Sequence, residues 1–153
     1  MIRLSQMTDY AVVLCCHLAR REAHASATEI SRATGIPAPT VAKLLGALTR
    51  AGLLISRRGA TGGFILARSA AEITLDRIVE AAEGPIALVQ CLDDGRDEEC
   101  GIESLCAMRP HWLVINRALR DALAGVTLAE LADLNGTSAT RAGALEAIGA
   151  PAG

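Results

Sequence analysis

Apolar residues recur at helical spacing in short segments along the first third of the chain. Residues 8–21 form the first segment, which opens with Thr8 as its predicted N-cap and ends in two arginines. Residues 26–35 form the second, in which Ser26 and Glu29 have the spacing of a capping box. The pattern therefore predicts two helices, the second shorter than the first.

A third helix is predicted after Gly35, which can end the second helix and begin a tight turn. Pro37 or Pro39 can open it, because proline is tolerated in the first turn of a helix. It ends near Gly52, and its apolar residues fall at i, i+3, i+4 and i+7: Val41, Leu44, Leu45 and Leu48. Two short helices joined by a tight glycine-containing turn are typical of a helix-turn-helix unit.

The face of the third helix opposite its apolar stripe is small and basic. It is formed by Thr40, Lys43, Ala47 and Arg50, with Ala42 and Gly46 beside them. Such a face can enter the major groove of DNA without steric conflict. Helix-turn-helix patterns also arise by chance, so this unit alone leaves DNA binding and a purely structural role both open.

Two short strands with a basic turn between them follow the third helix. Residues 53–56 and 64–67 are the predicted strands. The turn between them holds Arg57, Arg58, Gly59, Gly62 and Gly63. Glycines let the backbone approach phosphates, and an arginine at such a tip can enter the narrow minor groove. An ordinary solvent-exposed turn is the alternative, but a hairpin directly after a helix-turn-helix favours the wing of a winged helix.

The second half of the chain predicts three further helices. Thr74 is the expected N-cap of a short one. A long helix opens at Pro110, and apolar residues follow it as a heptad seam: Leu105, Met108, Trp112, Ile115, Leu119, Ala122 and Val126. This seam packs either within the chain or on a second copy, which we favour. Thr127 and Glu130 form another capping box, and residues 137–153 have the composition of a frayed tail.

Composition narrows the class of protein. Only three of the 153 residues are aromatic, so a core of packed aliphatic helices is expected. The chain has no run of eighteen apolar residues, and Asp9 and Tyr10 interrupt the place where a signal peptide would have its apolar stretch. We therefore expect a cytoplasmic protein whose five cysteines are not paired as structural disulfides.

Charge is distributed unevenly along the chain. Residues 1–68 hold nine Lys and Arg against three Asp and Glu, whereas residues 69–153 hold six Arg against fourteen Asp and Glu. A basic first half on a mildly acidic chain suggests a localised face that binds a polyanion. A solvated basic surface would have the same charges, so the asymmetry supports DNA binding only together with the motifs above.

Three of the five cysteines lie in the most polar segment of the chain. Cys91, Cys100 and Cys106 are separated by eight and five residues, which is not the spacing of a zinc ribbon. Thiolates are the main ligands of iron–sulfur clusters. Cys106 also precedes the N-terminus of the Pro110 helix, whose partial positive charge favours a thiolate. The segment therefore predicts a metal or cluster site.

Other residues leave several alternatives open. His111 is the nearest imidazole and a candidate fourth ligand, although an exposed surface role would explain it equally well. Asp9 is the alternative ligand, because in a dimer the first helix of one subunit can approach the cysteine-bearing loop of its partner. Cys15 and Cys16 lie in an apolar run and are expected in the core. A zinc module or a disulfide-forming sensor would use the same three thiols. An enzyme with Cys106 as nucleophile lacks a recognisable oxyanion motif.

Together these parts resemble the Rrf2 family of bacterial winged-helix regulators. The segments "LSQMTDYAV", "ATEISRATGIPAPTVAKLLGALTRAGLL" and "SRRGATGGFILAR", with three cysteines before a long helix, carry the resemblance over about residues 1–135. Within the family the chain is most similar to the IscR-like regulators of iron–sulfur cluster assembly that govern the SUF system. The combination of a wing and three cysteines is the specific part of the match.

We therefore predict a mainly α fold: a winged helix-turn-helix with a small β-hairpin wing and a long C-terminal dimerisation helix. Residues 1–83 would form the DNA-binding domain and residues 84–109 the cluster-binding loop. Residues 110–135 would hold the dimerisation helix and a short terminal helix, with the homodimer formed through residues 110–126. Residues 136–153 would be a flexible tail.

The resemblance also implies a function and its residues. It implies a homodimer on a double-stranded DNA operator and an iron–sulfur cluster, with [2Fe-2S] favoured over the [4Fe-4S] cluster of the nitric-oxide sensors. The predicted DNA-binding residues are Thr28, Pro39, Thr40, Lys43, Arg50, Arg57, Arg58 and Gly59, with Arg58 as the wing arginine. Asp9 matches the position from which nitric-oxide sensors supply a carboxylate, whereas Arg109 replaces the histidine expected after the third cysteine. A nitric-oxide or redox-sensing repressor of the same family is the alternative.

Overall fold

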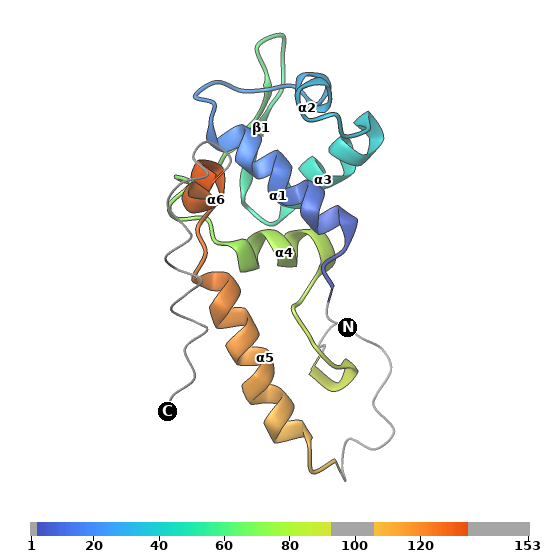
Figure 1. Cartoon of the computed structure of the whole chain (residues 1–153). Helices are drawn as coiled ribbons and strands as arrows, with labels where there is room; N and C mark the ends of the chain where they lie inside the picture. The colour runs from blue at the N-terminus through green and yellow to red at the C-terminus, as the bar shows by residue number, and fades with distance from the viewer. Residues whose placement is uncertain (1–2, 93–105, 135–153) are drawn as a thin grey trace.

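The computed structural model describes residues 3–92 and 106–134. In chain order the elements are α1 (Gln6–Ala19), α2 (Ala27–Thr34), α3 (Ala38–Arg50), β1 (Leu54–Arg57), β2 (Gly63–Leu66), α4 (Leu75–Glu83), the 3-10 turn η1 (Gln90–Leu92), α5 (Arg109–Ala124) and α6 (Leu128–Leu134). Helices α1 to α4 and the hairpin form a head, from which α5 projects (Figure 1). Within the two described ranges, no helix combines the length and the apolar character needed to cross a bilayer.

Helices α2 and α3 form the helix-turn-helix that the capping pattern predicts. The Glu29 N–H donates to Ser26 Oγ at 3.2 Å and the Ser26 N–H donates to the Glu29 carboxylate at 2.7 Å, so both bonds of the capping box are made. Gly35 ends α2 with a φ of +73°, in the left-handed region that favours glycine. The apolar stripe of α3 is buried as predicted: Val41, Leu44, Leu45 and Leu48.

An aliphatic core holds the head together. Its largest fully buried side chains come from α1 to α4, the segment before α4, and α6: Leu14, Leu18, Ile30, Leu44, Leu45, Leu48, Ile73, Ile78 and Leu128. Burial of one such side chain stabilises the fold by about 1.5–3 kcal/mol relative to leaving it exposed. Cys15 and Cys16 also lie in this core, which confirms that they are packing residues.

The wing is anchored to the helix-turn-helix by a contact that the sequence pattern did not reveal. Strands β1 and β2 are antiparallel, with a register that runs from Leu54 opposite Leu66 to Arg57 opposite Gly63. Ala25, just before α2, pairs with the other edge of β2: its N–H donates to Phe64 O at 3.1 Å and the Phe64 N–H donates to Ala25 O at 2.8 Å. The hairpin therefore cannot move without moving the start of α2.

The chain returns to the head after α5. The Leu75 N–H donates to Val126 O at 2.9 Å and the Leu128 N–H donates to Ile73 O at 2.8 Å, beside a β-bridge between Thr74 and Thr127. Helix α6 then packs on α1 and places Leu128 in the core. The predicted capping box of α6 is made, since the Glu130 N–H donates to the Thr127 hydroxyl at 3.2 Å and the Thr127 N–H donates to the Glu130 carboxylate at 2.8 Å. The C-terminal end of α5 is thus fixed to the head.

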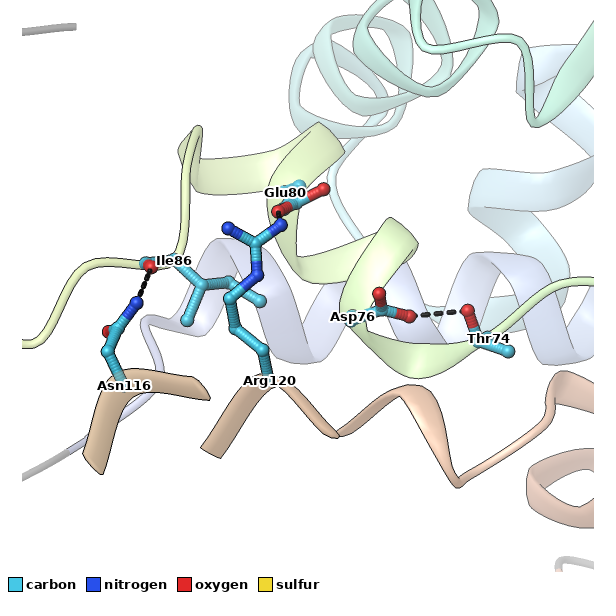
Figure 2. Close-up of polar contacts among 6 residues, drawn as sticks. All are labelled: Thr74, Asp76, Glu80, Ile86, Asn116 and Arg120. Atoms are coloured by element: carbon cyan, nitrogen blue, oxygen red, sulfur yellow. Dashed lines mark hydrogen bonds and ion pairs between the residues drawn. The ribbon is translucent and has the colours of Figure 1, made fainter. Parts of the chain in front are cut away.

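Two predicted helix starts differ in detail from the structure. The prediction that Thr8 caps α1 is wrong: Ser5 is the cap, because its Oγ accepts from the Thr8 N–H at 3.3 Å one turn earlier. Thr8 is fully buried and donates its hydroxyl to Glu83 instead. Thr74 is the N-cap residue of α4 as predicted, but its hydroxyl bonds to the Asp76 carboxylate (Figure 2).

The predicted heptad seam of α5 is divided between an exposed part and a part that packs within the chain. Trp112 and Leu119 of that seam are half-buried, on the side of the helix that carries the buried Asn116. Met108 and Ile115 of the same seam are exposed, at 49% and 44%, together with Leu113 and Val114 outside it. The seam is divided because one side of α5 packs on α4 and η1 of its own chain. The whole architecture is nevertheless the mainly α winged helix that the sequence predicts.

Candidate nucleic-acid interface and thiol site

The residues predicted to contact DNA lie at one end of the molecule. Helices α2 and α3 and the hairpin form this end, opposite the free end of α5 (Figure 1). All eight predicted side chains are accessible: Thr40 is half-buried and the others are exposed, namely Thr28, Pro39, Lys43, Arg50, Arg57, Arg58 and Gly59. The described part of the chain therefore presents accessible basic side chains on both the helix-turn-helix and the wing.

The start of α3 is suited to an anion. Its N-cap is Pro37, no side chain caps it, and its first turn holds no acidic residue. The N–H groups of Ala38 and Thr40 come before Val41, whose N–H makes the first bond of the helix, to Pro37 O, so they have no partner within the helix. Such groups, with the partial positive charge of a helix N-terminus, form a site for a phosphate oxygen.

The wing tip is a tight turn built around glycine. The Gly62 N–H donates to Gly59 O at 3.0 Å and closes the turn. A Cβ at Gly62 would lie 2.2 Å from Arg57 O, so no other residue fits there without a shift of the backbone. This turn holds Arg57 and Arg58 in solvent at the tip, where an arginine can reach a groove.

Two of the three predicted thiol ligands lie within the described residues. Cys91 lies in η1 and Cys106 lies just before α5, and both are half-buried. The Arg109 N–H donates to Cys106 O at 3.4 Å, which places Cys106 at the N-terminus of α5. This helix start also has no side-chain cap and no acidic residue in its first turn. Cys100 lies outside the described residues.

The chain segments that carry these two thiols are joined by Asn116 of α5. Its Nδ2 donates to Ile86 O at 3.0 Å and its Oδ1 accepts from the Leu88 N–H at 3.0 Å, as Figure 2 shows in part. One turn further along α5, Arg120 forms an ion pair with Glu80 of α4 at 2.7 Å (Figure 2). The sequence did offer a signal for Asn116, because it is a polar residue between Trp112 and Leu119 in an apolar helix.

The fourth ligand is not identified by the described residues. His111 is exposed in the first turn of α5 and Asp9 is exposed in the first turn of α1. Across residues 3–92 and 106–134, no three His, Cys, Asp or Glu side chains lie close enough together to hold a metal ion. The two thiols that the structure does place fit an iron–sulfur cluster in their chemistry, because cysteine sulfur is the main ligand of such clusters and both side chains are half-buried rather than packed in the core.

Cys15 and Cys16 lack the environment of ligands. Burial raises the pKa of Cys15 to about 12, and burial also raises the pKa of Cys16, against the smaller effect of Arg20. A metal binds the thiolate rather than the thiol, so a raised pKa opposes ligation. The separation of the five cysteines into two core residues and three candidate ligands therefore agrees with their surroundings as far as the structure describes them.

Glu83 joins the start of α1 to the end of α4. Its carboxylate accepts hydrogen bonds from the Thr8 hydroxyl and from the Ser5 N–H, the latter at 2.9 Å. The Thr8 bond, followed by the bonds from Ser5, holds the pKa of Glu83 below its ordinary value, although partial burial opposes this. Gly84 comes next, so Glu83 fixes the point at which the cysteine-bearing segment leaves the head.

A Glu83→Gln variant is expected to make the stability of the fold less sensitive to acid. The folded-state pKa is lowered, so the ionised carboxylate stabilises the fold above the ordinary pKa of glutamate, and this contribution is lost as the pH falls through the folded-state pKa. The wild type should be more stable by less than about 1 kcal/mol at neutral pH, and the two proteins should converge in acid. Urea unfolding of both proteins from neutral to acid pH measures this difference in stability, with the exposed Glu22→Gln substitution as the control. A difference that stays constant with pH would contradict the expectation.

The head with its basic end defines a class of protein, the winged-helix transcriptional regulators that bind DNA. A family model described as "Iron-dependent Transcriptional regulator" matches residues 4–134, and the chain belongs to this family, Rrf2. The resemblance drawn from the sequence is therefore confirmed. Relatives within the family are named as transcriptional regulators, which also confirms that the chain is a regulator rather than an enzyme.

Three relatives illustrate the range of the family. Protein aau3 of Rhizobium meliloti (strain 1021) is 34% identical over 131 residues, which cover 85% of this chain and 84% of the relative. The solved structure of CymR, described as the global cysteine regulator of B. subtilis, has a TM-score of 0.67 and 31% identity and covers 87% of this chain and 98% of its own. The solved structure of T. potens IscR has a TM-score of 0.65 and 25% identity, with 91% of each chain covered.

Proposed function

We propose that the chain is a homodimeric transcriptional regulator that senses iron–sulfur cluster status and controls genes of iron–sulfur cluster assembly. Cys91, Cys100 and Cys106 would hold the cluster, with [2Fe-2S] favoured over [4Fe-4S] and His111 or Asp9 as the remaining ligand. The observation that carries the proposal is the attachment of both described thiol segments to α5, which is itself bonded to the winged-helix head. The family description as iron-dependent supports it.

The DNA-binding step follows from the exposed groups of the head. Thr40 and Lys43, on the first turns of α3, would meet base edges in the major groove, and Arg58 would enter the minor groove from the wing. Arg50 and Arg57 would contact phosphates, together with the uncapped N–H groups of α3. Binding through such contacts releases counterions, so affinity for the operator falls as salt is raised.

A homodimer is supported by the apolar face that α5 leaves exposed. The large side chains on this helix and at its N-cap are 44–69% exposed: Met108, Leu113, Val114 and Ile115. Several large apolar side chains exposed on one helix of a small protein favour an interaction site. A second copy is the occupant that also suits a palindromic operator, because two-fold symmetry in the protein matches two half-sites about one helical turn apart.

The thiol site would give the regulator its signal. A bound iron–sulfur cluster supplies a group that exchanges an electron and reacts with oxidants or nitric oxide. The chain's own part is to hold Cys106 at the N-terminus of α5 and to bond residues 86–88, which lead to Cys91, to the same helix through Asn116. Arg120 connects that helix to α4, which packs against the recognition helix α3.

A second candidate is a thiol-based regulator without a cluster. The likeness to CymR, described as a cysteine regulator, favours it, because the same thiols could form a disulfide or hold zinc. Iron and acid-labile sulfide in anaerobically purified protein distinguish the two candidates. A colourless, iron-free protein whose thiols respond to oxidants would support the second.

The proposed interface can be tested with DNA selected from genomic fragments by the wild-type protein. Because Lys43 and Arg58 would contact base edges or groove atoms, Lys43→Ala and Arg58→Ala are each expected to weaken binding to this DNA by about 1–3 kcal/mol. Fluorescence anisotropy at several salt concentrations measures the loss, and sedimentation of the same samples measures the dimer. Arg77→Ala, at an exposed position on α4, is the matched control. Failure to select any DNA, or equal affinity of all four proteins, would contradict the proposed interface.

A further inference from the structure

Asn116 is the one side chain of α5 that is buried within the described part of that helix. A buried amide is costly unless its donor and its acceptor are both bonded. Both are bonded here, each at 3.0 Å, and both partners are backbone groups of the segment before η1. An apolar residue at this position would leave the Ile86 carbonyl and the Leu88 N–H without their partner on α5.

The two bonds lie close to the thiols in the chain. Leu88 is three residues before Cys91, and η1, which holds Cys91, itself contacts α5. Asn116 is seven residues along α5 from Arg109, a rise of about 10 Å at about 1.5 Å per residue, and Cys106 lies just before that helix. The Asn116 amide thus fixes the position of residues 86–88, which lead to Cys91, relative to α5, which begins just after Cys106.

We propose that Asn116 is a positioning residue for the thiol pair. By bonding the backbone of residues 86–88 to α5, it sets how closely Cys91 and Cys106 approach each other, and so sets the affinity of the chain for a thiophilic metal. The inference rests on the proposed function only in taking these two cysteines as ligands. Asn116 does not itself touch the metal, because it acts through the backbone that carries the first thiol.

Cadmium binding to the metal-free, full-length chain tests the proposal. The thiolate-to-Cd²⁺ absorption band, titrated in the presence of a competing chelator, reports affinity without iron, sulfide or DNA. Asn116→Ala is expected to weaken Cd²⁺ binding about tenfold, the lower end of the effect of residues that orient metal ligands. Arg120→Ala is the matched control, because it breaks the ion pair with Glu80 one turn away and leaves residues 86–88 untouched. Its Cd²⁺ affinity should equal that of the wild type.

A second substitution at Asn116, which removes only one of its two hydrogen bonds, distinguishes a positioning role from misfolding. Asn116→Asp keeps an acceptor for the Leu88 N–H and loses the donor to Ile86 O, so its Cd²⁺ affinity should fall between those of the wild type and Asn116→Ala. Hydrogen exchange of the Leu88 amide should accelerate in Asn116→Ala alone. A purely structural role predicts lower melting temperatures with unchanged Cd²⁺ affinity, and that result would overturn the proposal.

The failure of the proposed function can be told apart from the failure of this inference. A wild-type chain that binds Cd²⁺ through its thiols but holds no iron after anaerobic purification would overturn the cluster, and the Asn116 comparison would still stand. A wild-type chain whose thiols bind no Cd²⁺ would overturn both. Equal Cd²⁺ affinity in the wild type and both Asn116 variants would overturn the positioning role alone.

Discussion

From the proposed cluster site, wild-type protein purified anaerobically is expected to contain iron and acid-labile sulfide, and Cys106→Ala protein is expected to lose both. Cys106 lies at the N-terminus of α5, beside the segment that α5 bonds through Asn116, and an alanine offers no sulfur ligand there. With a second thiol in η1 and the third outside the described residues, the site has no spare cysteine. Iron and sulfide should fall to background, and the visible absorption of the wild type should disappear.

Cys16→Ala is the matched control for this result. The same substitution is made in the core of the head, where burial raises the pKa of the thiol and makes it a packing residue. That variant should lose some stability, because a buried thiol leaves a small cavity, but it should keep its iron. Equal iron in Cys106→Ala and the wild type would reject the cluster site, and iron loss in both variants would show that the loss reflects folding.

Gly63→Ala is expected to detach the wing and destabilise the fold by about 3 kcal/mol or more. Gly63 has a φ of +141°, and a Cβ there would lie 2.5 Å from Ala25 O and 3.0 Å from Ser26 N. These are backbone atoms of the segment that pairs with Phe64, so relief of the clash requires that the pairing opens. Urea unfolding gives the loss of stability, and faster hydrogen exchange of the Phe64 amide would locate it.

Gly59→Ala separates the clash from backbone strain. Gly59 also has a positive φ, of +111°, but nothing lies within 4 Å of an added Cβ. Strain alone should cost this variant about 1–2 kcal/mol and leave the Phe64 amide protected. If both substitutions destabilised the chain equally, the contact between the wing and the start of α2 would have no special role.

Local signals in the sequence were sufficient for most of the head. The capping box of Ser26 and Glu29 and the apolar stripe of α3 are local patterns, and each has the structure that its spacing predicts. The first helix shows the limit of such signals. Both Ser5 and Thr8 are good capping residues, and the choice between them depends on Glu83, which draws the Thr8 hydroxyl away and lies 75 residues further along the chain.

Contacts between distant backbone groups could not be predicted from spacing. The pairing of Ala25 with Phe64 and the bonds from Asn116 to residues 86–88 use main-chain donors and acceptors, which every residue type supplies. The seam of α5 shows the same limit, because a heptad pattern cannot tell which side of a helix its own chain covers. For the thiol site, the ligand set stays a prediction from spacing, because Cys100 lies outside the described residues.

The attachment of α5 gives it the mechanics of a lever. Its C-terminal end is pinned to the head through α6 and the bridge at Thr127, while its other end, next to Cys106, lies 16 residues away, a span of about 24 Å. A displacement of about 1 Å at that far end corresponds to a rotation of about 2° at the pinned end, given this span. A displacement near Cys106 would therefore reach α6 and the bridge at Thr127 as a change of angle rather than as a shift in position.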